Sequence, residues 1–144
     1  PASLKDFVWW SGLLVTEARQ GIAAIEQELL SDHFLAQKLY VHQSYKEEKT
    51  TDILHILPSY DEYLISYKDR TDVLNKEYQH KAFNSFGIFR PVILYNGQIV
   101  GNWNKVIQKQ TTHIEMNWFK KNTKIKRELL SLAERKYLTF FSEL

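Results

Sequence analysis

Apolar residues near the start of the chain recur with the period of an α-helix. From residue 18 they fall three or four positions apart, at Ala18, Ile22, Ile25 and Leu29. This spacing places them on one face and predicts a helix that starts at Thr16-Glu17. A shorter helix is predicted over residues 3–10, because Ser3 and Asp6 have the spacing of a capping box variant and Ser11-Gly12 can end a helix. Two helices joined by a short segment that contains Gly form a helix-turn-helix pattern.

The pattern then changes to that of β-strands. Residues 34–42 and 51–57 are predicted as two strands, joined through a polar turn at residues 46–50. A helix-turn-helix followed by a β-hairpin is a winged helix. We therefore predict a winged helix over residues 1–57.

The second half of the chain contains a strong hairpin signal at Asn96-Gly97. This dipeptide lies between two runs of β-branched and apolar residues. Both central positions of a type I′ turn need φ > 0, which Asn and Gly tolerate. We therefore predict a hairpin of residues 88–95 and 98–108, followed by a third antiparallel strand over residues 112–118.

The remaining segments complete an α+β fold. Residues 58–66 fit a helical turn or irregular structure, residues 72–80 a short helix or an extended excursion, and residues 81–87 a loop. Thr123 is predicted to cap a last helix. The apolar residues of this helix are Ile125, Leu129, Leu132, Tyr137, Phe140 and Phe141. The predicted architecture is a winged helix over residues 1–57, then an antiparallel β-rich subdomain with a closing C-terminal helix over residues 58–144.

Composition supports a globular protein with a real core, since 44% of the 144 residues are hydrophobic and 14% are aromatic. The chain has no cysteine, which suits a reducing cytosol, so we expect a cytoplasmic protein. Its apolar runs are far too short for a membrane span, and no charged-then-apolar leader opens it. Because the chain begins at Pro1, we expect it to be the C-terminal part of a longer protein or a trimmed piece.

Charge is distributed unevenly along the chain. Residues 1–103 carry 10 Lys/Arg against 13 Asp/Glu, whereas residues 104–144 carry 9 against 4. A basic zone of this size can bind a phosphate backbone, although lysines at the start of a helix are also a common solvated surface. Lysines in the first turns of a helix oppose its dipole, which favours some use for them.

Carboxylates and cations are concentrated in residues 57–70. Asp61-Glu62 is a possible catalytic pair, but adjacent side chains usually point apart, whereas glycosidase chemistry needs groups opposed across a substrate. Asp61 is equally well explained as the cap of the turn after Pro58. Lys68-Asp69-Arg70 is either an internal ion-pair cluster or a phosphate-facing corner.

Arg90 opens the next strand between Phe89 and Pro91, where its planar guanidinium is suited to a phosphate or a carboxylate. An ion pair with Asp61 or Asp69 is the alternative. The five histidines show no ligand spacing, so no metal site is predicted. No phosphate-binding, dinucleotide or nucleophile-elbow motif is present, and no cofactor is expected.

The outer face of the second predicted helix is a poor match to a base-reading helix. Glu17, Glu26 and Glu28 make it acidic, whereas a helix in the major groove is typically rich in Arg, Lys and Asn. This winged helix is therefore expected to be a scaffold rather than a reader of bases.

Four separated stretches together resemble the winged helix DNA-binding proteins of the AlkZ-like type. They are D-F-V-W-W-S-G-L at 6–13, A-R at 18–19, L-P-S-Y-D-E-Y-L-I-S-Y-K-D-R at 57–70 and F-R-P-V-I-L-Y-N-G-Q-I-V-G-N-W at 89–103. The resemblance runs in order over nearly the whole chain. It implies relatives that include bacterial DNA glycosylases, which excise alkylated bases and unhook interstrand cross-links. It also implies tandem winged helices cradling DNA, then a β-rich C-terminal domain, of which this chain looks like the last winged helix and that domain.

The residues that match the family's stretches are spread over both halves of the chain. They are Trp10, Asp61, Glu62, Tyr67, Asp69, Pro91, Gly97, Gly101 and Trp103. The family's catalytic signature is a Gln-aliphatic-Gln or Gln-aliphatic-Asp triplet in the N-terminal portion. Gln108-Lys109-Gln110 has the wrong middle residue and the wrong location, so the triplet is expected to be absent here. The resemblance thus implies a parent that hydrolyses an N-glycosidic bond with a positioned water, and a chain that contacts DNA without chemistry.

The leading hypothesis is a DNA-binding C-terminal fragment whose partner is double-stranded DNA, with neither a membrane nor a small-molecule cofactor involved. The basic residues expected to contact DNA are Lys68, Arg70, Arg90, Lys105, Lys109, Lys120 and Lys121. A structural or protein-interaction domain without DNA contact is the alternative, favoured by the acidic helix and the mild net charge of +2. A third interpretation is a small hydrolase centred on Asp61.

Overall fold

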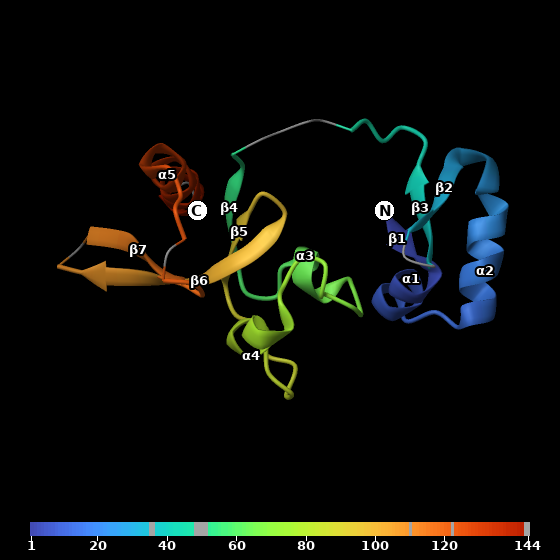
Figure 1. Cartoon of the computed structure of the whole chain (residues 1–144), viewed down its shortest axis with the longest axis horizontal. Helices are drawn as coiled ribbons and strands as arrows, with labels where there is room; N and C mark the ends of the chain where they lie inside the picture. The colour runs from blue at the N-terminus through green and yellow to red at the C-terminus, as the bar shows by residue number, and fades with distance from the viewer. Residues whose placement is uncertain (35–36, 48–51, 110, 122, 143–144) are drawn as a thin grey trace. The chain divides into compact units, whose positions relative to one another are not determined.

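The computed structural model describes residues 1–34, 37–47, 52–109, 111–121 and 123–142 (Figure 1). It is a mixed α+β fold with two antiparallel sheets. The chain forms two compact units, the first from residues 1–49 and 62–69 and the second from residues 50–61 and 70–144. A division into domains at residues 1–57 and 58–144 stays a prediction.

The first unit contains short helices and a three-stranded sheet of order β1-β3-β2. Its elements are β1 (Ala2–Ser3), α1 (Leu4–Ser11), α2 (Val15–Ala24), the 3₁₀-helix η1 (Glu26–Glu28), β2 (Leu29–Phe34), β3 (Gln37–His42) and α3 (Glu62–Ile65).

Helix α1 begins and ends where the sequence predicts. The Asp6 N–H donates to Ser3 Oγ at 3.2 Å, and the Ser3 N–H donates to Asp6 Oδ2 at 3.0 Å, which completes the capping box. At the other end Gly12 adopts φ +71°, and its N–H donates to the Val8 carbonyl at 3.1 Å. Both predicted helix signals are confirmed.

Helix α2 is shorter than predicted. Ala18 is fully buried and Ile22 is half-buried, but the helix ends at Ala24 and Ile25 is 45% exposed. A 3₁₀ turn follows, and Leu29 begins β2, where it pairs with His42. The predicted helical role of Leu29 is wrong, because pairing with β3 takes it into the sheet.

The hairpin of the first unit is formed by other residues than those predicted. β2 and β3 pair from Leu29 opposite His42 to Phe34 opposite Gln37. Residues 54–57 do not return to this hairpin, since β4 (Leu54–Leu57) pairs antiparallel with β5 (Val92–Tyr95) in the second unit. The predicted pairing of residues 34–42 with 51–57 is wrong, because burial of Leu54 and Ile56 against Ile93 fixes β4 in the other sheet. The predicted turn at 46–50 lies partly outside the described residues.

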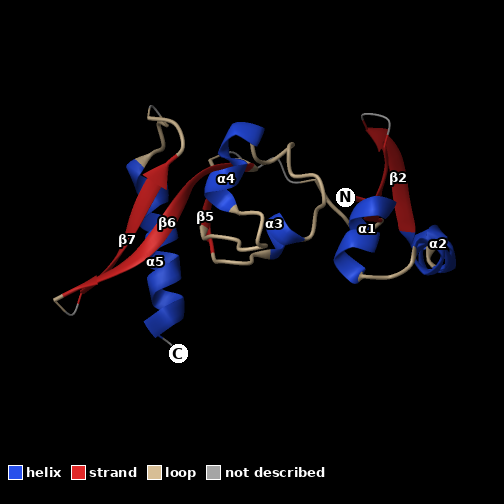
Figure 2. Cartoon of the chain, turned by 90° about the horizontal axis from the view of Figure 1, so that it is seen from below, coloured by secondary structure: helices blue, strands red, loops and turns tan. Residues whose placement is uncertain are grey.

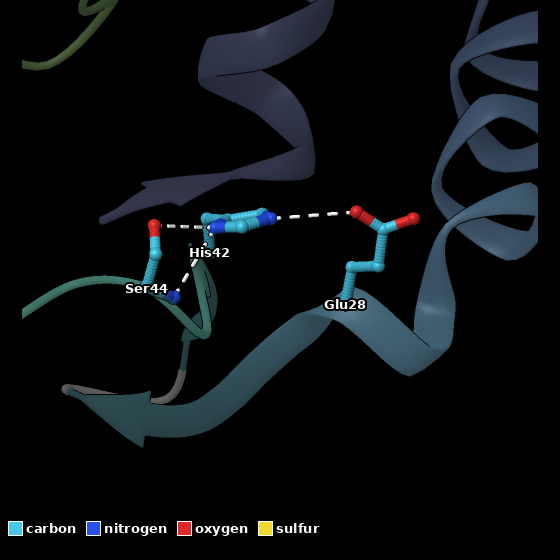
Figure 3. A network of polar contacts seen from close by, with 3 residues as sticks. All are labelled: Glu28, His42 and Ser44. Carbon is cyan, nitrogen blue, oxygen red and sulfur yellow. Dashed lines mark hydrogen bonds and ion pairs between the residues drawn. The ribbon is translucent and has the colours of Figure 1, made fainter.

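A small polar network closes the base of the β2–β3 hairpin (Figure 3). The Ser44 N–H donates to His42 Nδ1 at 3.2 Å, and Ser44 Oγ lies 2.6 Å from the same nitrogen. His42 Nε2 faces Glu28 Oε2 at 3.4 Å, so η1 is joined to the end of β3. All three side chains are exposed, so we expect this contact to orient the turn more than to stabilise it.

The second unit contains a four-stranded sheet of order β4-β5-β6-β7. Its other elements are the 3₁₀-helix η2 (Lys76–Tyr78), α4 (Gln79–Ala82), β6 (Gln98–Gln108), β7 (Thr111–Trp118) and α5 (Arg127–Ser142). Asn96 and Gly97 turn the chain between β5 and β6 with φ +47° and +79°, as the type I′ prediction requires. The predicted hairpin and third strand are confirmed.

Helix α5 packs on one face of this sheet, and Figure 2 shows it crossing behind β6 and β7. The buried cluster between them consists of Leu54, Ile93, Trp103, Ile114 and Ala133. Trp103 Nε1 donates to the Leu57 carbonyl at 2.8 Å, and its ring packs edge-on against Tyr137, 4.5 Å between centroids. The predicted cap at Thr123 is wrong, because the helix begins at Arg127 and the Thr123 hydroxyl donates to the Lys120 carbonyl at 2.9 Å.

Candidate nucleic-acid interface

The face of the β4–β7 sheet opposite α5 carries a row of amide side chains. Successive strand residues point to opposite faces, and cross-strand partners share a face. Trp103 is opposite Met116 and both pack toward α5, whereas Asn102 is opposite Asn117. Asn104 follows on the same face as Asn102. The sequence therefore directs polar amides to the face that α5 leaves uncovered.

These amides line an open hollow of about 380 Å³. The residues that contribute atoms to its lining are Lys81, Arg90, Pro91, Asn102, Trp103, Asn104, Asn117, Trp118 and Phe119. Asn104 and Asn117 are exposed, while Asn102 Nδ2 donates to the Pro91 carbonyl at 2.8 Å. Such a lining offers charge to a phosphate and amide groups to polar base edges.

The two cations of the hollow are held by different means. The Arg90 N–H donates to the Ala82 carbonyl at 2.8 Å, which fixes its backbone at the end of α4 and leaves an exposed side chain. Lys81 Nζ lies 5.3 Å from the centroid of the Tyr78 ring and 5.4 Å from that of Phe119. These rings hold the ammonium by cation–π attraction, and Lys81 is half-buried.

Arg70 lies in an aromatic cluster rather than in the lining of the hollow. Its guanidinium carbon is 5.1 Å from the Phe83 ring centroid and 5.2 Å from that of Phe89. The Phe83 and Phe89 rings stack on each other with 5.2 Å between centroids. This packing is a sufficient structural role for Arg70, and its predicted contact with DNA stays a prediction.

Lys68 belongs to the first unit. Its Nζ lies 5.6 Å from the Trp9 ring centroid, and its backbone N–H donates to Asp6 Oδ1 at 3.3 Å. Lys68 also lines a second hollow of about 510 Å³ in this unit. The other lining residues are Leu4, Lys5, Val8, Trp9, Gly12, Leu13 and Val15.

The remaining predicted basic residues occupy different places on the second unit. Lys105 is opposite Ile114, which puts it on the sheet face that α5 covers rather than the face of the hollow. Lys109 lies in the β6–β7 turn with φ +45°. Lys120 and Lys121 are exposed directly after Phe119, at the edge of the hollow. Of the predicted set, only Arg90 lines the hollow itself.

Several of the matched residues make contacts that build the first unit. Trp10 Nε1 donates to Glu62 Oε2 at 3.1 Å, and the Tyr67 hydroxyl donates to the Pro1 carbonyl at 3.4 Å. Asp61 is half-buried directly before α3, and Asp69 is exposed. These contacts attach residues 62–69 to α1 and the N-terminus.

The matched residues of the second unit support its sheet. Gly97 forms the hairpin turn and Trp103 fills the core. The Pro91 carbonyl accepts from Asn102 Nδ2, and Gly101 lies close to the backbone of Asn117. Of the residues that line the hollow, Arg90 was among those predicted from the sequence, whereas Lys81, Asn104 and Asn117 were not. The spacing of Asn102 and Asn104, two residues apart in one strand, is the sequence signal for a row of amides on one face of the sheet.

The part of the chain that the structure describes contains neither a cluster of metal ligands nor a helix that could cross a membrane. No group of three or more His, Cys, Asp or Glu side chains is arranged there to hold a metal ion. None of its helices has the length and apolar character needed to cross a membrane.

Comparison with known proteins gives a consistent picture. Residues 1–140 match the model of the family described as DNA glycosylase AlkZ-like. Among solved structures, the chain is similar in fold to the Streptomyces sahachiroi DNA glycosylase AlkZ, with a TM-score of 0.71 and 19% sequence identity. The match covers 92% of this chain and 37% of that protein. No curated protein sequence matches the chain.

Proposed function

The chain belongs to the AlkZ-like DNA glycosylase family, and from this premise we propose that it binds double-stranded DNA as part of DNA repair. The binding surface is the hollow on the face of the β4–β7 sheet opposite α5. The observation that carries this proposal is the convergence of Lys81 and Arg90 with Asn104 and Asn117 on that face.

The chemistry of the hollow suits a phosphate backbone beside base edges. Arg90 presents a planar fork that can bind a phosphate through two hydrogen bonds, and Lys81 adds a point charge. Lys120 and Lys121 extend the positive surface at the edge of the hollow. Contacts to two to four phosphates give a slope of log affinity against log salt of about −2 to −4.

In this proposal the first unit is the winged helix. The order of α1, α2 and the β2–β3 hairpin supports that assignment. The acidic residues Glu17, Glu26 and Glu28 argue against insertion of this part into a major groove. We assign it a scaffold role, and a cytoplasmic location for the protein as a whole.

Base excision is not assigned to this chain. It spans 37% of the length of the AlkZ structure that it matches, and the only Gln-x-Gln stretch has Lys109 at its centre. Gln110 of that stretch lies outside the described residues. Release of an alkylated base from duplex DNA by this chain alone would overturn this part of the proposal.

The first prediction tests the hollow directly. Arg90→Gln and Lys81→Gln should each weaken binding to a fluorescently labelled duplex and make the salt slope shallower by about 1, because each removes one phosphate contact. Anisotropy titrations between low and physiological salt measure both quantities. The control is Lys136→Gln, an exposed residue of α5 with the same change of charge. Equal effects of all three variants would show that the hollow is not the binding surface.

A protein-interaction domain without DNA contact is the second candidate function. It is favoured by a group of exposed apolar side chains on the first unit, namely Trp9, Trp10, Leu13, Leu14 and Val15. The indole N–H groups of Trp9 and Trp10 already donate to the Ile65 carbonyl and the Glu62 carboxylate. The exposed parts of these two rings are therefore apolar. Absence of duplex binding even at low salt would favour this candidate over the first.

A further inference from the structure

The loop between α4 and β5 has a shape fixed by its own hydrogen bonds. Asn84 Oδ1 accepts from the backbone N–H groups of Phe86 at 3.0 Å and Ile88 at 3.1 Å. The Asn84 N–H donates to the Ile88 carbonyl at 3.2 Å, and the Gly87 N–H donates to the Asn84 carbonyl at 3.2 Å. Gly87 has φ +76°, a conformation that suits glycine. The tip is therefore ordered without help from the Phe86 ring.

The base of the loop is clamped by aromatic packing. Phe83 and Phe89 form an antiparallel bridge, and their rings stack with an angle of 28° between their planes. The guanidinium of Arg70 lies against both rings. A loop with a clamped base and a braced tip can present a side chain with little loss of conformational freedom on binding.

Phe86 stands at this tip with 87% of its surface exposed, more than any other large apolar side chain that the structure describes. Its neighbour Ile88 is 48% exposed. The Phe86 ring is thus little buried by the folded chain, and the hydrogen bonds that shape the loop come from Asn84 and the backbone. An aromatic ring presented in this way is available to a partner.

Cations flank the two arms of the loop. Lys81 precedes it in α4 and Arg90 follows it, and both line the hollow. The hydrogen bond from Arg90 to Ala82 brings the arms together, so the loop rises from the edge of the hollow. Figure 1 shows the segment between α4 and β5 extending beyond α4. Positive groups at the base and an apolar tip match an occupant that is anionic outside and aromatic within, which describes stacked bases between phosphates.

We propose that Phe86 is a wedge that inserts between stacked bases of duplex DNA while Arg90 and Lys81 hold the adjacent phosphates. This rests on the proposed DNA binding of the hollow. Apolar wedges of this kind partly unstack a base step, and the new contact with the ring offsets the cost. The ring stacks on the bases without reading their sequence, so insertion favours steps that open easily, such as mismatched or damaged ones.

The second prediction tests the wedge with the whole chain and a duplex containing 2-aminopurine, whose fluorescence rises when it loses stacking. The unaltered protein should raise the fluorescence, Phe86→Ala should abolish the rise and weaken binding about tenfold, and Phe86→Trp should keep both. Phe140→Ala, which removes a 61% exposed ring from α5, should leave both unchanged. Thermal melting of Phe86→Ala should match that of the unaltered chain.

Other outcomes distinguish failure of the proposed wedge from failure of the proposed DNA binding. If Phe86→Ala keeps the fluorescence rise while salt-sensitive binding persists, the wedge is wrong and the proposed function stands. If the unaltered chain binds no duplex at low salt, both fail. If sedimentation instead shows self-association that Phe86→Ala removes, the occupant is a second copy of the chain and the wedge is overturned.

Discussion

Gly101 lies at a point in β6 where the backbone of β7 leaves no room for a side chain. A Cβ there would lie 2.6 Å from the carbonyl oxygen of Asn117 and 3.2 Å from Ile93 Cδ1. The carbonyl belongs to the backbone of β7 and cannot move aside without disturbing the ladder. As the third prediction, Gly101→Ala should lower the free energy of unfolding by about 1–3 kcal/mol. Urea unfolding followed by tryptophan fluorescence measures the change.

Gly21 supplies the control for Gly101. It lies inside α2, and a Cβ there would meet no atom within 4 Å. Gly21→Ala should therefore raise the free energy of unfolding by about 0.5–1 kcal/mol, because alanine loses less conformational entropy in a helix. A loss of stability at Gly21 as large as that at Gly101 would contradict the steric explanation.

The comparison of Gly97 with Gly101 shows what the sequence reveals at the scale of residues. Gly97 follows Asn96 between two apolar runs, so its role in a turn is a local property and was predicted. The role of Gly101 depends on the register between β6 and β7, which brings it opposite Trp118. Register is a non-local property, and a single sequence does not contain it explicitly.

At the scale of elements, the start of α1 depends on Ser3. Its hydroxyl accepts the Asp6 N–H and also donates to Asp6 Oδ2 at 2.6 Å, and Ser3 is buried. As the fourth prediction, Ser3→Ala should cost about 1 kcal/mol in the free energy of unfolding, since a helix N–H loses its partner. Ser131→Ala, an exposed change inside α5, is the matched control in the same urea experiment. Equal stability of the two variants would contradict the capping role.

An ion pair connects the chain just before β4 with the chain just before α5. Lys126 Nζ donates to Asp52 Oδ2, and the Tyr95 hydroxyl donates to Asp52 Oδ1 at 3.2 Å. The hydrogen bond from Lys126 is the main cause that holds the pKa of Asp52 below its ordinary value. Because the folded chain keeps Asp52 ionised, this contribution to stability is present above the ordinary pKa of about 3.9 and is lost as the pH falls through the lower folded value.

The fifth prediction follows from this loss of stability at low pH. Lys126→Met should lower the urea midpoint near neutral pH, and the difference from the unaltered chain should shrink below about pH 4. High salt should reduce it as well, since both groups are partly exposed. Lys124→Met, an exposed change of the same type, should show no such pH dependence. A difference that stays constant into acid would rule out the ion pair as its source.

Elements defined by local signals were predicted well, and those defined by partners were not. The capping box at Ser3, the turn at Asn96-Gly97 and strand β7 all follow from neighbouring residues. The partner of β4 does not, because Leu54 and Ile56 find their core against Ile93, far away along the chain. Thr123 has the residue type of a cap, but bonding to Lys120 and the later start of α5 leave that role unused.

At the scale of the whole molecule, the sequence identified the family and one residue of the hollow. Arg90 was recognisable from its place beside Pro91. Lys81, Asn104 and Asn117 come from three elements that only the folded sheet brings together. Counting lysines in the tail pointed to Lys105 as well, but strand alternation turns it to the other face. Net charge along the chain therefore suggested the proposed binding of DNA but did not locate a surface for it.

The interleaving of the two compact units has a consequence for how this protein can be cut or recombined. Residues 62–69 belong to the first unit, yet segments of the second unit flank them on both sides. A fragment that ends at Leu57 deprives the indoles of Trp9 and Trp10 of the Ile65 carbonyl and the Glu62 carboxylate. A single gene crossover therefore cannot separate the two units, because any piece that keeps one unit whole also carries part of the other, and a clean exchange of either unit requires more than one junction.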